Sequence, residues 1–221
     1  MDETFPFDHF MPEAITFFRQ LAKNNEREWF QANKERYETY VKADAQAFCN
    51  EMTPLLSDMT GVPHQSKMFR IHRDVRFSKD KRPYKAHLHI LFRPVEDRAN
   101  QPAWFFGLEP KGLFFGVGVM GMQKGALDHF RARVAGPDGE DLEKVLESFA
   151  RKSIRVRDPE LKRVPNQYGQ DHPRGALLKH KSLTAWVDHD TPDAALQATC
   201  LKTCKAEFRK IKPLFDWFMD G

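Results

Sequence analysis

The stretch AWFFGLEPKGLFFGVGVM, residues 103–120, decides the fold class. Its two apolar runs, 103–109 and 112–120, flank the short polar link EPKG, an arrangement typical of a β-hairpin. Two segments ahead of it, MFRIHRDVRF (68–77) and HLHILFR (87–93), alternate apolar and polar residues with period two. Four successive strands with short connections predict an antiparallel meander.

Helical periodicity precedes and follows these strands. The predicted helices cover residues 12–22, about 26–59, 126–135, 139–150 and about 194–219. Pro54 is expected to kink or end the second of them, and Pro213 to bend the last. The order predicts an α+β fold with N-terminal helices, a central antiparallel meander sheet of about four or more strands, and C-terminal helices.

We expect one domain over residues 1–221. Its parts are a helical N-terminal part (1–62), the central sheet (63–122), and helices with a basic loop (123–221). The chain has 221 residues, 41% of them hydrophobic, which is enough for a sizeable core.

Several absences predict a cytoplasmic protein without a membrane partner. No apolar run reaches the roughly 18 residues that a membrane span needs. The N-terminus begins with acidic residues and lacks the basic segment of a secretory signal. The three cysteines, Cys49, Cys200 and Cys204, are too few for a disulfide framework and fit a reducing compartment. Cys200 and Cys204 share one face of the last helix, and we interpret them as ordinary helix residues.

The charge distribution is uneven. The net charge is only +4, but residues 67–87 and residues 151–181 each carry +6, so the rest of the chain carries −8. Local clusters of one sign create a local potential that attracts the opposite charge. The two basic segments therefore predict an anionic partner if they lie side by side.

The first basic segment contains RDVRFSKDKRPYKAH, residues 73–87. Arginine offers a planar fork for phosphate or carboxylate, and lysine offers a mobile point charge. The candidate anion-binding residues are Arg70, Arg73, Arg76, Lys79, Tyr84, Lys85 and, from the second basic segment, Lys181. Arg73 falls among the apolar positions of its predicted strand. It therefore needs a carboxylate partner, a bulge that turns it outward, or a buried anion.

Three residues are candidates for acid–base chemistry: Asp74, His87 and His172. His172 follows Asp171 directly, and such a pair either orients an imidazole for catalysis or only caps a turn. His87 and His89 have the spacing of two metal ligands on one strand face, but no spacing selects a third ligand. We therefore predict no metal site.

Gly116 and Gly118 lie at period two on one face of their predicted strand. Without side chains they leave a shallow groove, which a ligand or a closely packed helix could fill. We expect a helix.

Three segments of this chain together resemble a family of bacterial and fungal conserved hypothetical proteins classed as a domain of unknown function. They are FFRQLAKNNEREWFQANKERY, KMFRIHRDVRFSKDKRPYKAH, and LKRVPNQYGQDHP followed by LLKHKSL. The resemblance extends roughly from Phe10 to Phe218. The family-like positions are Asn25, Arg27, Trp29, Phe30, Asn33, Arg70, Arg73, Asp74, Arg76, Phe77, Ser78, Lys79, Asp80, Pro83, Tyr84, Lys85, His87, Asp171, His172, Pro173 and Lys181. After the glycine-rich strand this chain reads VMGMQKGAL, where the family has an aromatic residue and a proline. The resemblance implies no particular activity or cofactor.

We expect the protein to bind an anionic or phosphorylated small molecule at a basic cleft built from residues 70–87 and 171–181. Whether it also transforms this ligand, as an enzyme, is left open. One alternative is a nucleic-acid-binding module, whose affinity would depend steeply on salt. The other is a structural protein whose basic hairpin pairs with the acidic N-terminal helix. The sequence indicates no particular cofactor or oligomeric state.

Overall fold

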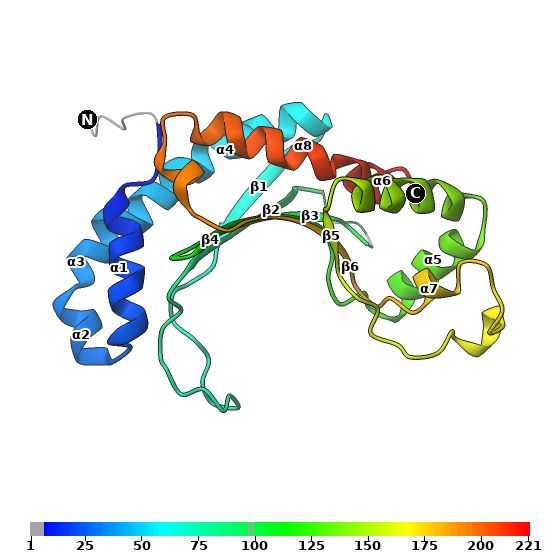
Figure 1. Ribbon diagram of the computed structural model, residues 1–221, viewed down its shortest axis with the longest axis horizontal. Helices are drawn as coiled ribbons and strands as arrows, with labels where there is room; N and C mark the ends of the chain where they lie inside the picture. The colour runs from blue at the N-terminus through cyan, green and yellow to red at the C-terminus, as the bar shows by residue number, and fades with distance from the viewer. Residues whose placement is uncertain (1–6, 97, 99) are drawn as a thin grey trace. The chain divides into compact units, whose positions relative to one another are not determined.

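The computed structural model describes residues 7–96, 98 and 100–221 (Figure 1). Helices at both ends and a six-stranded antiparallel sheet in the middle confirm the α+β prediction. The strands are β1 (His64–Met68), β2 (Leu88–Pro94), β3 (Ala103–Glu109), β4 (Gly112–Val119), β5 (Arg155–Val156) and β6 (Leu183–His189). They are hydrogen-bonded in the order β1-β2-β3-β4-β6-β5, so the first four form a meander.

The chain divides into two compact units, each built from segments that are distant in sequence. Unit 1 comprises Met1–Phe92, Phe105–Phe114 and His189–Ala206. Unit 2 comprises Arg93–Trp104, Phe115–Asp188 and Glu207–Gly221. The expectation of a single domain over residues 1–221 stays a prediction.

The N-terminal helices belong to unit 1. They are α1 (Pro12–Lys23), α2 (Arg27–Ala32), α3 (Lys34–Tyr37), the π-helical turn η1 (Glu38–Lys42) and α4 (Ala43–Thr60). Pro12 occupies the first turn of α1, where a missing N–H costs no hydrogen bond. Ile15, Phe18 and Leu21 recur at helical spacing and are buried, which confirms the predicted helix.

The single helix predicted over about 26–59 is divided in the structure. Asn33 lies between α2 and α3, and its side-chain Nδ2 donates to the carbonyl oxygen of Trp29 at 2.9 Å. Such a bond competes with helix continuation. Pro54 lies inside α4 without ending it. The helix ends at Thr60 and is followed by Gly61, whose left-handed φ of 76° suits glycine at this position.

Aromatic rings form the core of unit 1. Phe48 of α4 lies with its ring centroid 4.5 Å from that of Phe106 in β3 and 6.1 Å from that of Phe92 in β2. Phe10, ahead of α1, stacks on Phe106 at 5.7 Å. The buried side chains Leu88, Ile90 and Phe92 confirm the predicted alternation of β2.

The strand predicted over 68–77 is wrong. The strand β1 ends at Met68, and the following residues form a long loop with one isolated bridge, His72 to Tyr84. Within the loop, Asp74 accepts a hydrogen bond from the backbone N–H of Arg76, and Asp80 accepts one from that of Arg82. These local bonds offer the backbone an alternative to a strand ladder. Phe77, which falls on the apolar face of the predicted strand, is 96% exposed.

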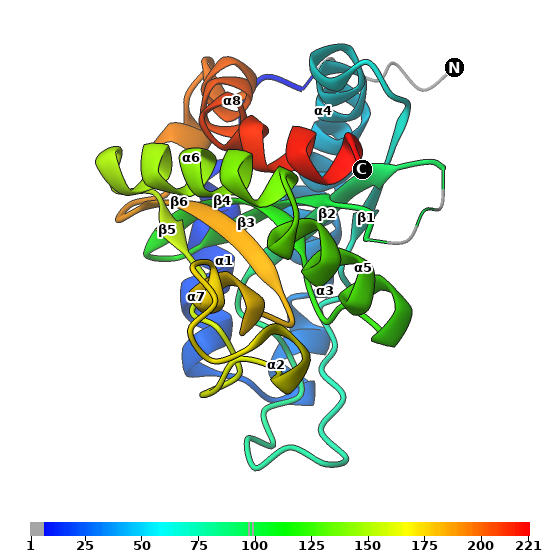
Figure 2. The ribbon, with the colours of Figure 1, turned by 90° about the vertical axis from the view of Figure 1, so that its right-hand side faces the viewer.

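Unit 2 holds most of the elements that follow β4. They are α5 (Lys124–Ala135), α6 (Asp138–Arg151), the 3₁₀ turn η2 (Asn166–Tyr168), α7 (Gly175–Leu178), β5, β6 and the end of α8 (Cys200–Met219). Figures 1 and 2 show α6 above β5 and β6, and α7 below them. Trp104 stacks on Phe215 at 4.8 Å and contacts Phe208 edge-on, so these rings form the core of this unit.

The groove predicted at Gly116 and Gly118 is filled by β6, and the expected helix does not fill it. A Cβ on Gly116 would lie 2.6 Å from the ring of Trp186. At Gly118 the backbone of Leu183 and Thr184 approaches closely, and φ is 136°. The strand β6 was not predicted.

The last helix begins later than predicted. A 3₁₀ turn, η3 (Asp193–Leu196), precedes α8, and Pro213 lies inside α8. Cys200 and Cys204 are buried one turn apart, with Sγ atoms 3.9 Å from each other. Across the described residues, every helix is too short or too polar to cross a lipid bilayer.

Candidate functional site

The basic loop, residues 69–87, leaves β1 and returns to β2 (Figure 1). Its base is closed by backbone hydrogen bonds, from the N–H of Phe69 to the oxygen of His89 at 3.0 Å and from Lys85 to Ile71 at 2.8 Å. A third bond joins Arg73 to Pro83 at 2.8 Å. These three bonds hold the two ends of the loop together, and we call the paired ends, residues 69–73 and 83–87, the neck of the loop.

The neck is anchored to the N-terminal helices. The ring of Tyr84 is buried and stacks on Phe30 of α2, with centroids 4.2 Å apart. Asn25, between α1 and α2, donates through Nδ2 to the carbonyl oxygen of Tyr84 and accepts at Oδ1 from its N–H, each at 3.0 Å. Tyr84, a predicted ligand-binding residue, thus has a packing role at this position.

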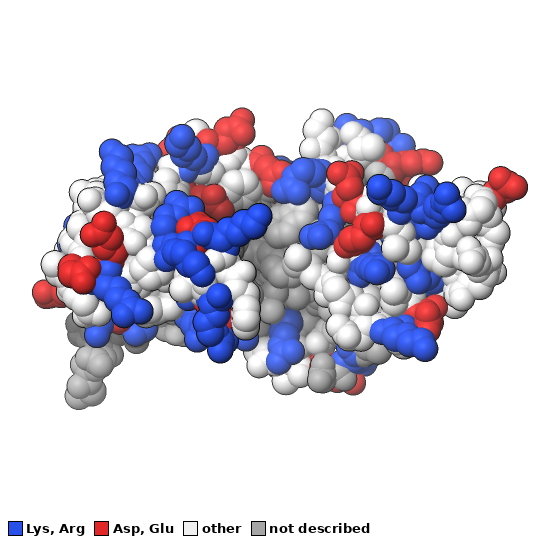
Figure 3. Space-filling view, turned by 90° about the horizontal axis from the view of Figure 1, so that it is seen from below, with Lys and Arg blue, Asp and Glu red and all other residues white. Residues whose placement is uncertain are grey.

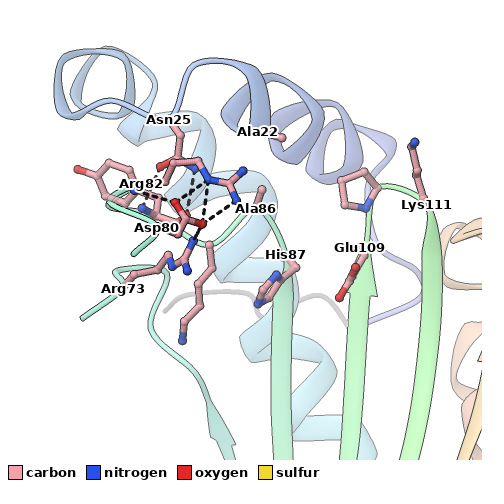
Figure 4. A pocket seen from close by; sticks show the side chains of 12 residues that line it. Ala22, Asn25, Arg73, Asp80, Arg82, Ala86, His87, Glu109 and Lys111 are labelled. Carbon is pink, nitrogen blue, oxygen red and sulfur yellow. Dashed lines mark hydrogen bonds and ion pairs between the residues drawn. The ribbon is translucent and has the colours of Figure 1, made fainter. Parts of the chain in front are cut away.

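Asp80 is the carboxylate partner of Arg73. The Nη1 atom of Arg73 lies 2.5 Å from Oδ2 of Asp80, and Arg82 donates to the same carboxylate at 2.7 Å. Hydrogen bonds from Arg82, and then from Arg73, hold the pKa of Asp80 well below its usual range. Figure 4 shows Asp80 between the two guanidinium groups. Three explanations were considered for Arg73: a carboxylate partner, an outward bulge or a buried anion. The structure shows the first, an ion pair with Asp80 within the loop.

A pocket of about 620 Å³ opens beside this cluster, and every residue that lines it belongs to unit 1 (Figure 4). Its charged lining consists of four cations and two carboxylates: Arg73, Arg82, Lys85, Lys111, Asp80 and Glu109. The other lining residues are Ala22, Asn25, Tyr84, Ala86, His87 and Pro110. Positive charge is therefore in excess in the pocket wall.

Lys85 is a half-buried cation of this wall. Partial burial, and then repulsion by Arg70 and Arg73, lower the pKa of its ammonium group. Its Nζ lies 5.6 Å from the ring centroid of Phe69, a cation–π distance. In the described part of the chain, no carboxylate lies within ion-pair distance of Lys85.

His87 and His89 meet Glu109 at the far end of the pocket wall. The two imidazoles stack with centroids 3.9 Å apart, and Nε2 of His89 lies 3.4 Å from Oε1 of Glu109 on β3. Burial, and then the nearby charges of His89, Lys85 and Arg73, lower the pKa of His87 to about 4. Burial also lowers the pKa of His89, although Glu109 acts in the opposite direction.

The remaining predicted residues of the loop lie outside the pocket. Arg70 and Lys79 are exposed, and neither lines it. Arg76 pairs with Asp74 at 2.6 Å, at the surface, so the charge of this aspartate is offset by an arginine two residues away. Figure 3, which looks onto this side of the molecule, shows Lys and Arg side chains gathered around acidic ones in unit 1.

The predicted residues of the second basic segment belong to unit 2. His172 accepts a hydrogen bond at Nδ1 from the backbone N–H of Arg174 at 3.0 Å. This bond caps a turn, which is the second of the two roles considered for the Asp171–His172 pair. The side chain of Lys181 is exposed, and the backbone N–H of Lys181 donates to the carboxylate of Glu160 at 2.7 Å. The meeting of residues 70–87 with residues 171–181 around an anion stays a prediction.

Glu109, Lys111 and Gly107 were not predicted as site residues. Gly107 and Glu109 share one face of β3 by period two, a signal that the sequence does carry. The pairing of that face with His89 depends on strand register, which the sequence leaves open. Asn25 stood among the family-like positions, but it was not predicted as a site residue.

Fold and site together define an α+β protein with a cationic pocket, which is lined by the basic loop, by Ala22 and Asn25 of the N-terminal helical region, and by residues 109–111 at the turn from β3 to β4. Residues 13–217 match the family described as "Conserved hypothetical protein (DUF2461)", and the chain belongs to this family. The sequence resemblance is thereby confirmed. A comparison with curated proteins found no match.

Proposed function

We propose that unit 1 binds a small anionic molecule, with phosphate as the recognised group, in the pocket beside Arg73 and Lys85. The observation that carries this proposal is the unequal pairing of charge in the pocket wall. One carboxylate, Asp80, serves both Arg73 and Arg82, and Lys85 has no carboxylate partner among the residues described. Like charges gathered around one carboxylate favour an anion that completes the balance.

The size of the pocket favours a small molecule over nucleic acid. Pockets for small ligands typically measure roughly 300–1,000 Å³, and this one is about 620 Å³. Three apolar residues, Ala22, Ala86 and Pro110, contribute to its wall and suit the uncharged part of such a ligand. Arg73 supplies a planar fork whose direction Asp80 fixes, and Lys85 supplies a point charge.

The alternative of a structural protein with internally paired charges accounts for the loop arginines, but it does not account for Lys85. Asp74 and Asp80 of the same loop pair with the three arginines Arg73, Arg76 and Arg82. These partners come from the loop itself and not from the acidic N-terminal helix that the sequence suggested. Lys85 and Lys111 remain in the pocket wall as charges that this pairing does not offset.

The experiment that tests the proposal is thermal denaturation with phosphate, pyrophosphate and phosphorylated metabolites. A ligand that binds only the folded state at 100 times its Kd stabilises it by about 2.7 kcal/mol. We expect saturable stabilisation of the wild type and at least a roughly tenfold weaker response in Lys85→Met, which keeps the apolar stem. Lys79→Met is the matched control, because it removes the same charge from the same loop outside the pocket.

Two outcomes would count against the proposal. One is a wild type that no anion stabilises. The other is an equal loss in Lys79→Met and Lys85→Met, because diffuse attraction by the whole loop would then account for the response.

A further inference from the structure

His87, His89 and Glu109 form a cluster that the anion proposal does not use. Each residue offers one ligand atom, and these atoms all lie within 4.8 Å of one another. His87 and His89 project from one side of the chain at β2, and Glu109 is the last residue of the neighbouring β3. From this geometry we propose that the three side chains bind one divalent transition-metal ion, with zinc as the best fit.

The distances support this assignment. Zinc bonds to histidine nitrogen and carboxylate oxygen measure about 2.0–2.2 Å, so neighbouring ligand atoms in a tetrahedral site lie about 3.3–3.6 Å apart. The His89 Nε2 to Glu109 Oε1 distance of 3.4 Å already has this value. The remaining pairs lie within 4.8 Å, which small side-chain rotations can close.

Gly107 makes room for the cluster. A Cβ at this position would lie 3.3 Å from Cδ2 and 3.4 Å from Nε2 of His89, closer than most side-chain contacts. The residue that faces His89 from β3 therefore lacks a side chain, and the imidazole can lie over the strand toward Glu109. A loose surface cluster would not need this small residue.

Three protein ligands of the His–His–Glu type leave a coordination position open, as in catalytic zinc sites and in non-haem iron(II) sites. His87 and Glu109 also line the pocket, so the metal would lie in the pocket wall. Lys85 and Arg73 are near enough to act on His87 electrostatically, and they oppose a cation there. The negative charge of the Glu109 carboxylate offsets part of this electrostatic repulsion of the metal ion.

Zinc titration of the full chain, freed of metal by a chelator and kept in phosphate-free buffer, tests the assignment. Calorimetry with zinc chloride alone should give one equivalent bound to the wild type. His89→Ala and Glu109→Gln should weaken binding by more than the roughly 10–100-fold that loss of an outer-shell partner costs. His129→Ala, at an exposed histidine of unit 2, should leave the affinity unchanged.

Two further variants keep the test decisive if a ligand substitution also disturbs folding. Gly107→Ala retains all three ligands but crowds His89, so it should weaken zinc binding. Lys85→Met removes an opposing cation and should strengthen zinc binding while it weakens the response to phosphate. These opposite directions separate a failure of the metal site from a failure of the anion site.

Cobalt(II) gives a spectroscopic readout of the ligand set. We expect visible bands of a nitrogen–oxygen site in the wild type and their loss in Glu109→Gln. A strong thiolate charge-transfer band would place the metal at Cys200 and Cys204 and overturn the assignment. So would a wild type that binds neither zinc nor cobalt stoichiometrically, or full affinity in both ligand variants.

Discussion

The side chain of Asn25 makes two reciprocal hydrogen bonds with the backbone of Tyr84, each 3.0 Å long. The two residues are 59 positions apart in sequence, and the pair ties the neck of the basic loop to the turn between α1 and α2. The pocket wall that carries Arg73, Lys85 and His87 therefore depends on a contact between the loop and a residue outside it.

Asn25→Ala should lower the free energy of unfolding by about 1–3 kcal/mol, because it leaves the N–H and C=O of the partly buried Tyr84 backbone without their partner. It should also weaken the phosphate response, since Lys85 follows Tyr84 directly. Urea denaturation measures the first effect. Gln31→Ala, at an exposed position of α2, is the control and should change stability by less than about 0.5 kcal/mol. A stable Asn25→Ala with an unchanged phosphate response would show that the contact does not shape the site.

Ile71 and Phe77 have opposite environments although both fall on one face of the strand expected from the sequence. Ile71 is 4% exposed and Phe77 is 96% exposed. Ile71→Ala should therefore destabilise the protein by about 2–5 kcal/mol, whereas Phe77→Ala should change stability by less than about 0.5 kcal/mol. Paired urea denaturation curves compare the two. Equal destabilisation would mean that residues 68–77 form the predicted strand after all.

Because of Glu160, we expect the stability of unit 2 to depend on pH. Partial burial raises the pKa of its carboxyl, but hydrogen bonds from the backbone of Lys181 and from Ser182 outweigh it and lower the pKa to about 2. Because the folded-state pKa lies below the ordinary value of 4.5, the stabilisation is complete above about pH 4.5 and is lost as the pH falls toward 2.

Glu160→Gln should remove about 1 kcal/mol of this stabilisation at neutral pH, a modest value because the carboxyl is partly exposed to water. The variant and the wild type should then converge in stability as the pH falls from 4.5 to 2. Glu147→Gln, at an exposed carboxyl of α6, serves as the control. A difference between Glu160→Gln and wild type that grows on acidification would have the wrong sign.

Gly116 should not tolerate a side chain, because Trp186 of β6 lies against it. Gly116→Ala should cost about 1–3 kcal/mol, as overpacking of a core does. Gly125→Ala, at an open position of α5, should be neutral or stabilise by up to about 1 kcal/mol. Thermal denaturation of both variants measures the two effects. If the groove were open, Gly116→Ala would leave the stability unchanged.

The sequence predicts those elements whose periodicity is not disturbed by local side-chain bonds. The hairpin of β3 and β4 and the helices α1, α5 and α6 agree with their apolar patterns. The period-two pattern at 68–77 failed because Asp74, Ser78 and Asp80 bind nearby backbone N–H groups and turn the chain. The strand β6 was missed because its neighbour β4 ends far earlier in the chain, at Val119, so no hairpin signal marks β6 in the sequence.

Several residues that the sequence singled out line the pocket, but the residues they interact with were not predicted. Arg73, Lys85 and His87 were named from charge and motif, and all three line the pocket. The partner of Arg73 was not foreseen, because Asp80 lies seven residues away and only the fold of the loop brings the two together. Glu109 faces His89 through strand pairing, which a single sequence does not specify.

The most direct test of the anion site is a crystal structure of the full chain grown with tungstate, a phosphate analogue that scatters X-rays strongly. The account predicts one anomalous peak in the pocket, within hydrogen-bonding distance of the guanidinium of Arg73 and the ammonium of Lys85, and its loss in Lys85→Met. Tungstate bound only at other surfaces, or a pocket without a peak at saturating tungstate, would contradict it.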